Sequence, residues 1–174
     1  TRLNDNTADD GAGIFITSGP LVIDASEVNT NIAGEHGGGI RTSGPSGSIT
    51  ITGTTFYGNQ APSGSGGAIE LTFDGSITGS TFEQNHSENT GGAIFVGGNL
   101  TITGSTFKDN TTDDEGGALF VSFADSLLII NSTRSGNKAK KGGGIYNEGE
   151  LALINSTLTG TEAAWVRLKG AAAL

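Results

Sequence analysis

The stretch Gly91-Gly-Ala-Ile-Phe-Val-Gly-Gly-Asn-Leu-Thr-Ile-Thr-Gly-Ser-Thr-Phe-Lys-Asp-Asn110 has two halves that recur along the chain, a Gly-Gly-Ala-Ile start and a Phe-x-x-Asn end. Counterparts of the first half begin at Gly11, Gly37, Gly66, Gly116 and Gly142, so successive starts lie 26, 29, 25, 25 and 26 residues apart. The terminal asparagine keeps the same period, at Asn6, Asn31, Asn59, Asn85, Asn110 and Asn137. Self-similarity at such a period predicts a solenoid.

Each repeat contains short segments in which every second residue is apolar, as in Ile94 and Val96 and then in Leu100 and Ile102. This alternation is typical of strands with one buried face. Because a short strand cannot bury that face alone, each coil has to stack on the next at about 4.8 Å. We therefore predict an all-β fold, a parallel β-helix of about six coils with ~25 residues in each coil.

The repeat also predicts which side chains point into the coil. Phe56, Phe82 and Phe107 fall one above another and should stack inside it, and Asn85 and Asn110 should be buried members of an amide ladder. The same reasoning gives a buried core that includes Ile69, Phe82, Ile94, Ile102, Phe107 and Leu119.

One corner of the coil has a recognisable residue chemistry. The position before the Ser/Thr pair is mostly Gly or Asn, which indicates a left-handed backbone there. Its members are Ala25, Gly53, Gly79, Gly104, Asn131 and Asn155, of which only Ala25 departs from the pattern.

Composition limits the function classes. The absence of cysteine excludes a disulfide scaffold and thiol chemistry, and two histidines leave little scope for an imidazole metal site. A formal charge of −9 disfavours nucleic acid and anionic membranes as partners. We expect no cofactor and, without an apolar run of 18 or more residues, no membrane insertion.

The repeat defines the organisation of the chain. Residues 1–160 are predicted as the β-helix, 161–170 as a non-repeat segment that is a cap or a tail, and 171–174 as vector-derived residues. Trp165 in the second segment is either a lid over the last coil or foreign. Because the chain begins in mid-coil, we expect a piece of a longer protein, with unpaired strand edges that invite end-to-end self-association.

We identify no catalytic constellation in the sequence. The acids Asp24, Glu70, Asp74, Asp125 and Glu150 fall at different coil positions, so we interpret them as surface residues, and we expect His36 and His86 to be exposed in variable loops. The cluster Asp113, Asp114 and Glu115 leaves a calcium site open as an alternative to a solvated acidic loop, although no complete calcium-loop motif is present.

Strand alternation places one further row of residues on the outside of the coil. If Ile94 and Val96 point inward, Phe95 and its counterparts point outward. Phe95, Phe120 and Tyr146 should then form an exposed aromatic strip beside an Arg41–Glu70 pair. We predict that these five residues form a partner-binding face, the alternative being that the rings only stabilise neighbouring coils.

The paired Gly-Gly-Ala-Ile/Leu and Phe-x-x-Asn signature, seen in full at residues 66–85 and 91–110, resembles the repeats of polymorphic outer-membrane proteins, which are autotransporter adhesins. It is similar also to the broader class of bacterial right-handed parallel β-helix repeat proteins. The resemblance covers residues 3–160. It implies a right-handed coil in an exported passenger domain at the bacterial cell surface, where it binds a host-cell or cell-surface protein or glycan.

Several functions remain compatible with these observations. The leading hypothesis is a non-enzymatic, surface-exposed adhesin fragment. The alternative is a carbohydrate-active β-helix, a lyase or hydrolase, which three convergent acidic or basic groups in one groove would favour. An ice-binding array is suggested by Thr50, Thr52 and their counterparts in the next two repeats, and a filament or scaffold protein is also open.

Overall fold

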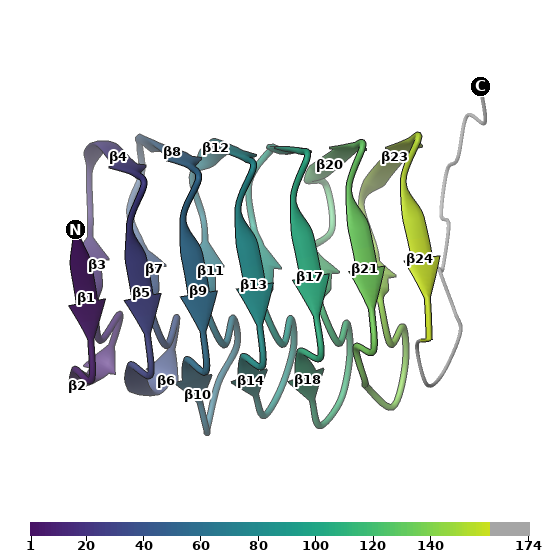
Figure 1. The fold of residues 1–174 in the computed structure, drawn as a ribbon. Helices are drawn as coiled ribbons and strands as arrows, with labels where there is room; N and C mark the ends of the chain where they lie inside the picture. The colour runs from purple at the N-terminus through teal and green to yellow at the C-terminus, as the bar shows by residue number, and fades with distance from the viewer. Residues whose placement is uncertain (161–174) are drawn as a thin grey trace.

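The computed structural model describes residues 1–160, in which all regular structure is β-strand. Residues 161–170 with Trp165, and residues 171–174, lie outside the described part, so the predictions for them stay untested. Within residues 1–160 there is no helix that could cross a membrane. Figure 1 shows the coils stacked in a row, from the N-terminal β1 to β24.

The strands form four parallel sheets that run along the coil axis. Sheet A contains β1 (Arg2–Asn4), β5 (Glu27–Asn29), β9 (Thr55–Tyr57), β13 (Thr81–Glu83), β17 (Thr106–Lys108), β21 (Thr133–Ser135) and β24 (Thr157–Thr159). Sheet B contains β2 (Thr7–Asp10), β6 (Ile32–His36), β10 (Gln60–Ala61), β14 (His86–Ser87) and β18 (Thr111–Thr112).

The Gly-Gly-Ala-Ile segments supply sheet C, and the second apolar alternation supplies sheet D. Sheet C contains β3 (Ile14–Ile16), β7 (Ile40–Thr42), β11 (Ile69–Leu71), β15 (Ile94–Val96), β19 (Leu119–Val121) and β22 (Ile145–Asn147). Sheet D contains β4 (Gly19–Asp24), β8 (Gly47–Thr52), β12 (Asp74–Thr78), β16 (Leu100–Thr103), β20 (Ser126–Ile130) and β23 (Glu150–Ile154). The predicted parallel β-helix is confirmed.

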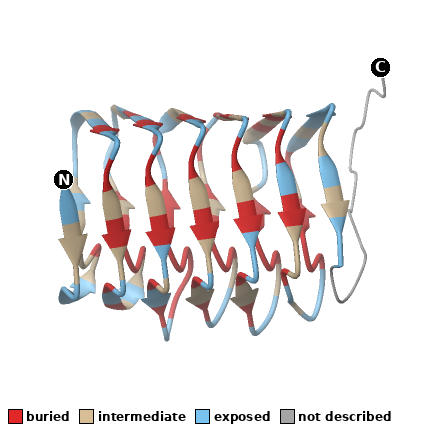
Figure 2. Ribbon diagram, in the orientation of Figure 1, coloured by how far each residue is buried: buried red, intermediate tan, exposed pale blue. Residues whose placement is uncertain are grey.

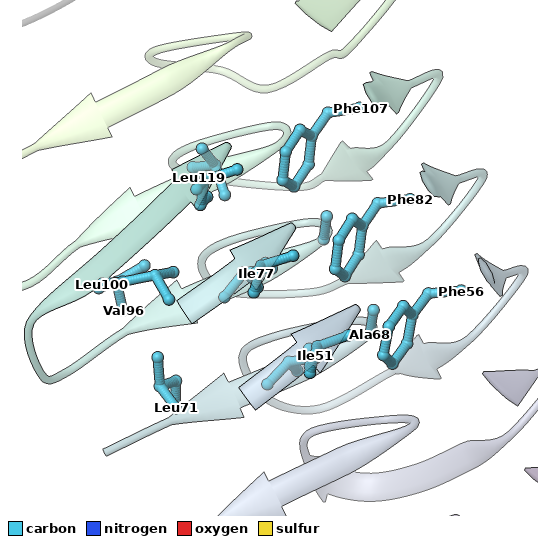
Figure 3. Close-up of a cluster of buried hydrophobic side chains, with 14 of the residues drawn as sticks. Ile51, Phe56, Ala68, Leu71, Ile77, Phe82, Val96, Leu100, Phe107 and Leu119 are labelled. Carbon is cyan, nitrogen blue, oxygen red and sulfur yellow. The ribbon is translucent and has the colours of Figure 1, made fainter. Parts of the chain in front are cut away.

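The coil interior is filled by columns of like residues, because each strand pairs in register with its counterpart one coil away. Figure 2 shows buried segments that recur at equivalent places in successive coils. The rings of Phe56 and Phe82 stack at 4.6 Å between centroids, and those of Phe82 and Phe107 at 4.7 Å (Figure 3). All six predicted core residues are buried. The phenylalanine column begins with Leu3 and Val28 and continues past Phe107 to a fully buried Arg134.

The predicted asparagine ladder is present from Asn6 to Asn137. In each step the backbone N–H and the side-chain Nδ2 of one asparagine both donate to Oδ1 of the next, at 3.1 and 2.9 Å from Asn85 to Asn110. The side chain of Asn110 also donates to the carbonyl oxygen of Phe82, at 2.9 Å. Every buried amide of the ladder therefore bonds both a neighbouring asparagine and the backbone of an earlier coil.

A second ladder, of hydroxyl groups, follows the left-handed corner. The Ser80 hydroxyl donates to the carbonyl oxygen of Thr78 at 3.0 Å and accepts the backbone N–H of Thr54 at 3.2 Å. The same arrangement recurs at Ser26, Thr54, Ser105, Ser132 and Ser156. The sequence analysis did not predict this ladder, although a Ser or Thr stands at this position in every repeat.

The corner residues all have the predicted left-handed conformation, with φ between 42° at Ala25 and 59° at Gly104. Ala25 adopts this conformation in spite of its Cβ atom, which is sterically disfavoured for an L residue. A Cβ atom added to Gly104 would meet nothing within 4 Å. The corner therefore favours glycine for the backbone conformation alone.

Replacing Asn110 with leucine should lower the free energy of unfolding by about 1–3 kcal/mol for the polar groups left without partners, which include the N–H and Nδ2 of Asn85. Urea melts measure this loss. Asn89→Leu, at an exposed asparagine outside the ladder, is the control. An equal effect in both variants would contradict a stabilising ladder.

Ala25→Gly should raise the free energy of unfolding by about 0.5–1 kcal/mol, because relief of left-handed strain exceeds the entropy cost of glycine. The reciprocal change Gly104→Ala should lower it by about 1 kcal/mol. Both values come from urea melts. The explanation fails if the two changes shift stability in the same direction.

Candidate functional site

The outward row of sheet C brings together the five residues predicted as a partner-binding face. Parallel pairing aligns the residue after each Gly-Gly-x-Ile/Leu, in the order Phe15, Arg41, Glu70, Phe95, Phe120 and Tyr146. The row has a charged half near the N-terminus and an aromatic half near the C-terminus.

The aromatic half is stacked but not exposed, so the predicted exposed strip is wrong. Ring centroids lie 5.4 Å apart for Phe95 and Phe120 and 5.5 Å apart for Phe120 and Tyr146. Only 7% of Phe120 and 8% of Tyr146 is accessible, and Phe95 is half-buried. Each ring covers a face of its neighbour, and the Phe95 ring also lies against the backbone at Gly97.

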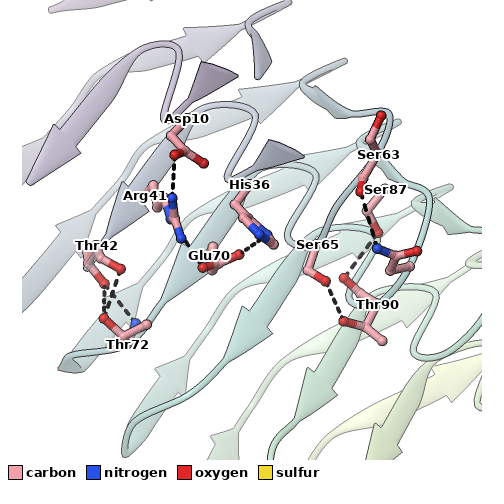
Figure 4. Close-up of polar contacts among 11 residues, drawn as sticks. Asp10, His36, Arg41, Thr42, Ser63, Ser65, Glu70, Thr72, Ser87 and Thr90 are labelled. Carbon is pink, nitrogen blue, oxygen red and sulfur yellow. Dashed lines mark hydrogen bonds and ion pairs between the residues drawn. The ribbon is translucent and has the colours of Figure 1, made fainter. Parts of the chain in front are cut away.

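The charged half is a network that joins the first three coils (Figure 4). The predicted Arg41–Glu70 pair is present, with 3.3 Å between Nε and Oε1. Arg41 Nη1 lies 2.5 Å from Asp10 Oδ2, and His36 Nδ1 lies 2.6 Å from Glu70 Oε2 without the alignment of a hydrogen bond. The guanidinium of Arg41 is also 5.6 Å from the Phe15 ring centroid.

Glu70 is the buried centre of this network, so the prediction that it is a surface residue is wrong. Its side chain is only 9% accessible, and both oxygens face a basic group. Burial raises the pKa of the Glu70 carboxyl above its ordinary value of 4.5, against the opposing effect of His36 and Arg41. We call Asp10, His36, Arg41 and Glu70 the charged clasp.

Acid and base converge in the charged clasp, as general acid–base chemistry requires. Its charged atoms, however, bind one another across adjacent coils. The half-buried side chains of Asp10, His36 and Arg41 surround the buried carboxylate. Sequence reasoning found the Arg41–Glu70 pair but missed Asp10 and His36, which end strands β2 and β6 of sheet B and pair across a register shift. His36 and His86 are half-buried, so the prediction that both are exposed in variable loops is wrong. In its present arrangement the charged clasp holds coils together.

A second polar site lies at the corner between sheets C and D. A pocket of about 300 Å³ is lined there by Pro45, Ser46, Gly47, Thr72, Phe73 and Asp74. Asp74 Oδ1 accepts the backbone N–H and Nδ2 of Asn99, at 2.8 and 3.0 Å, and Asn99 Oδ1 accepts the Ser126 hydroxyl at 2.7 Å. Partial burial, and then the charge of Asp74, raise the pKa of Asp125.

The remaining candidate residues do not gather into one site. Asp24 and Glu150 are exposed in sheet D, and His86 is half-buried, with 3.0 Å between its Nδ1 and the Thr111 hydroxyl. Glu115, one of the three acids considered for calcium, accepts from Lys141 Nζ at 2.7 Å. Within residues 1–160 no group of three or more His, Asp or Glu side chains could hold a metal ion.

Glu70 predicts a pH-dependent stability. A carboxyl group whose folded-state pKa is raised stabilises the fold below its unfolded pKa near 4.5, and this stabilisation is lost as the pH rises through the folded pKa. Relative to Glu70→Gln, the wild type should therefore lose free energy of unfolding as the pH increases from 4 to 7. Urea melts at each pH test this difference, with the exposed Glu35→Gln as the charge-matched control. A wild-type advantage that grows with pH would contradict it.

The comparisons with known proteins agree with the four parallel sheets. A family model described as the right-handed β-helix region matches residues 1–162. No curated protein and no solved structure matches the chain. The family match extends over nearly the whole chain, including all six coils of sheets C and D. The chain belongs to the right-handed β-helix family.

Proposed function

We propose that this chain is a non-enzymatic binding rod, the passenger part of an adhesin, and that it contacts its partner through the outer face of sheet D. The observation that carries the proposal is a regular, almost uncharged face on a protein with a formal charge of −9. Protein interfaces are depleted in charge at their centre, so such a face is suited to contact.

Two of the three outward rows of sheet D make up this face, and the third row, at the start of the strands, contains the charged Asp74 and Glu150. The first contains Val22, Thr50, Ser76, Thr101, Leu128 and Ala152, and the second contains Asp24, Thr52, Thr78, Thr103, Ile130 and Ile154. Asp24, at the N-terminal end, is the only charged residue in either row. Because the pairing runs through all six strands without a register shift, the rows form a straight surface.

The other faces are less suited to contact. Sheet A presents ion pairs, with 3.0 Å between Arg2 Nε and Glu27 Oε2 and 2.7 Å between Lys108 Nζ and Glu83 Oε1. In the outward row of sheet C the stacked rings and the charged clasp already contact one another, which leaves few groups free to bind a partner. The two rows of sheet D therefore form a surface from which a partner can displace water at a small cost in free energy.

The chemistry of the face favours a protein partner. It combines threonine hydroxyl and methyl groups with aliphatic side chains at Leu128, Ile130 and Ile154, which suits packing against another protein surface. The aliphatic residues also interrupt the threonine rows after three coils, which argues against an ice-binding array. The signature that resembles polymorphic outer-membrane proteins supports a partner on a host cell and a location at the bacterial surface.

Binding of the fluorescently labelled chain to cultured animal cells tests the proposal. Thr101→Glu/Thr103→Glu introduces two charges at the centre of the face and should weaken binding about tenfold or more. The matched control is Thr81→Glu/Thr106→Glu, whose half-buried threonines lie on the outside of sheet A. This control should bind like the wild type.

Two further measurements complete the experiment. Circular dichroism has to show that both double variants are folded, and trypsin treatment of the cells should abolish binding by removing surface proteins. Binding that survives trypsin would indicate a glycan. Equal loss in both double variants, or no binding by the wild type, would contradict the proposal.

A carbohydrate-active enzyme is the second candidate, because the charged clasp brings four acidic and basic groups together. Incubation with neutral and acidic polysaccharides, followed by assay for new reducing ends and unsaturated products, tests this function. Activity that disappears in Glu70→Gln would replace the adhesin proposal.

A further inference from the structure

Arg134 occupies a place in the core that other coils fill with apolar side chains. It lies above Phe107 in the column of Val28, Phe56, Phe82, Phe107, Arg134 and Leu158. Its accessible fraction is 0%. A guanidinium group has therefore replaced a phenyl ring at the end of a continuous aromatic stack.

The buried guanidinium has no hydrogen-bond partner among the described residues. Nε, Nη1 and Nη2 are all buried and all unpaired, so five N–H donors are unused. An isolated charge in an apolar interior is strongly destabilising unless a counter-charge and hydrogen bonds compensate it. Arg134 should therefore have a partner that the described side chains do not provide.

Deprotonation of the Arg134 guanidinium does not remove its need for a counter-charge and hydrogen-bond partners. Burial lowers the pKa of Arg134 from its ordinary value to about 10. The group consequently remains protonated at neutral pH, and its positive charge stays in the core.

The position that faces Arg134 carries a smaller residue than in the three preceding coils. The residue that faces the column is Ala68, Ala93 and Ala118 in three successive coils, and Gly144 in the next. At the corresponding Gly39 an added Cβ atom would lie 3.0 Å from Val28 Cγ1, and Figure 3 shows Ala68 beside the Phe56 ring. Gly144 therefore removes a methyl group from the position facing Arg134.

Asn147 adds a second polar change at an inward position. In the three preceding coils its counterparts in sheet C are the apolar Leu71, Val96 and Val121. Asn147 is 1% accessible, and its Nδ2 donates to the carbonyl oxygen of Gly149 at 2.8 Å. Its Oδ1 has no partner among the described residues, so it can accept a hydrogen bond from a water molecule that accompanies a ligand.

We propose that a small monovalent anion of about the size of chloride binds inside the coil at Arg134, in the space left by Gly144. The anion accepts hydrogen bonds from the guanidinium and supplies the missing counter-charge. A halide is close to a methyl group in size, which matches the difference between glycine and alanine. The site would link the stability of the C-terminal coils to the anion present when the chain folds.

The test is thermal unfolding at constant sodium concentration and ionic strength, with gluconate replaced stepwise by chloride. Because the site is enclosed, each sample is refolded from urea in its own anion mixture. The wild-type midpoint should rise linearly with the logarithm of chloride concentration above the dissociation constant. Crystals grown in bromide should show an anomalous peak beside the Arg134 guanidinium.

Two variants locate the effect. Arg134→Phe continues the aromatic stack and should unfold at the same temperature in chloride and gluconate. Gly144→Ala keeps the charge but fills the space, and it should also lose the chloride dependence. Gly144 is not among the glycines with positive φ, so alanine suits its backbone as it does in the preceding coils.

A wild-type midpoint that is equal in chloride and gluconate would overturn the proposal, and so would a chloride dependence that persists in Arg134→Phe or in Gly144→Ala. If Arg134→Phe fails to fold, the wild-type series, Gly144→Ala and the bromide peak still decide the question.

Discussion

The structure depends on the bonding of each coil to the next through equivalent residues. Short strands of two to six residues have little stability of their own, and they gain it when their backbone groups and inward side chains meet similar neighbours. The asparagine ladder shows this dependence most directly, because one amide accepts two donors from the coil before it and donates to the coil after it. A change in one coil therefore acts first on its immediate neighbours.

This constraint explains why so much of the fold could be predicted from the sequence. A residue that has to match its counterparts leaves a periodic signal, so the strands, the Phe56–Phe107 stack, the amide ladder and the left-handed corner were all visible. The hydroxyl ladder left the same signal and was missed, because Ser and Thr are also common at corners for conformational reasons. Its geometry became clear only with the donor and acceptor atoms in place.

The outer surface was harder to predict because it obeys no such constraint. Alternation identified the outward row of sheet C but not the extent to which Phe120 and Tyr146 are covered by neighbouring side chains and backbone. The charged clasp illustrates the same limit. Arg41 and Glu70 share one repeat position and could be paired from sequence. Asp10 and His36 end sheet B strands that pair across a register shift, and the repeat does not predict this shift.

Departures from the repeat are informative for the same reason. Stacking alone would favour phenylalanine, alanine and valine at the positions of Arg134, Gly144 and Asn147, since those residues fill the columns in neighbouring coils. The three departures lie in the same coil, but Figure 3 shows that the column continued by Asn147, with Leu71 and Val96, lies apart from the phenylalanine column. The added cation at Arg134 and the removed volume at Gly144 have a common explanation if a small anion occupies the interior. The threonine rows of sheet D are different, because like residues there face solvent and contribute little to the stacked interior. Threonine is β-branched and favours strands, so the requirements of the sheet already account for much of this regularity, and the partner contact proposed above would add a second reason for it.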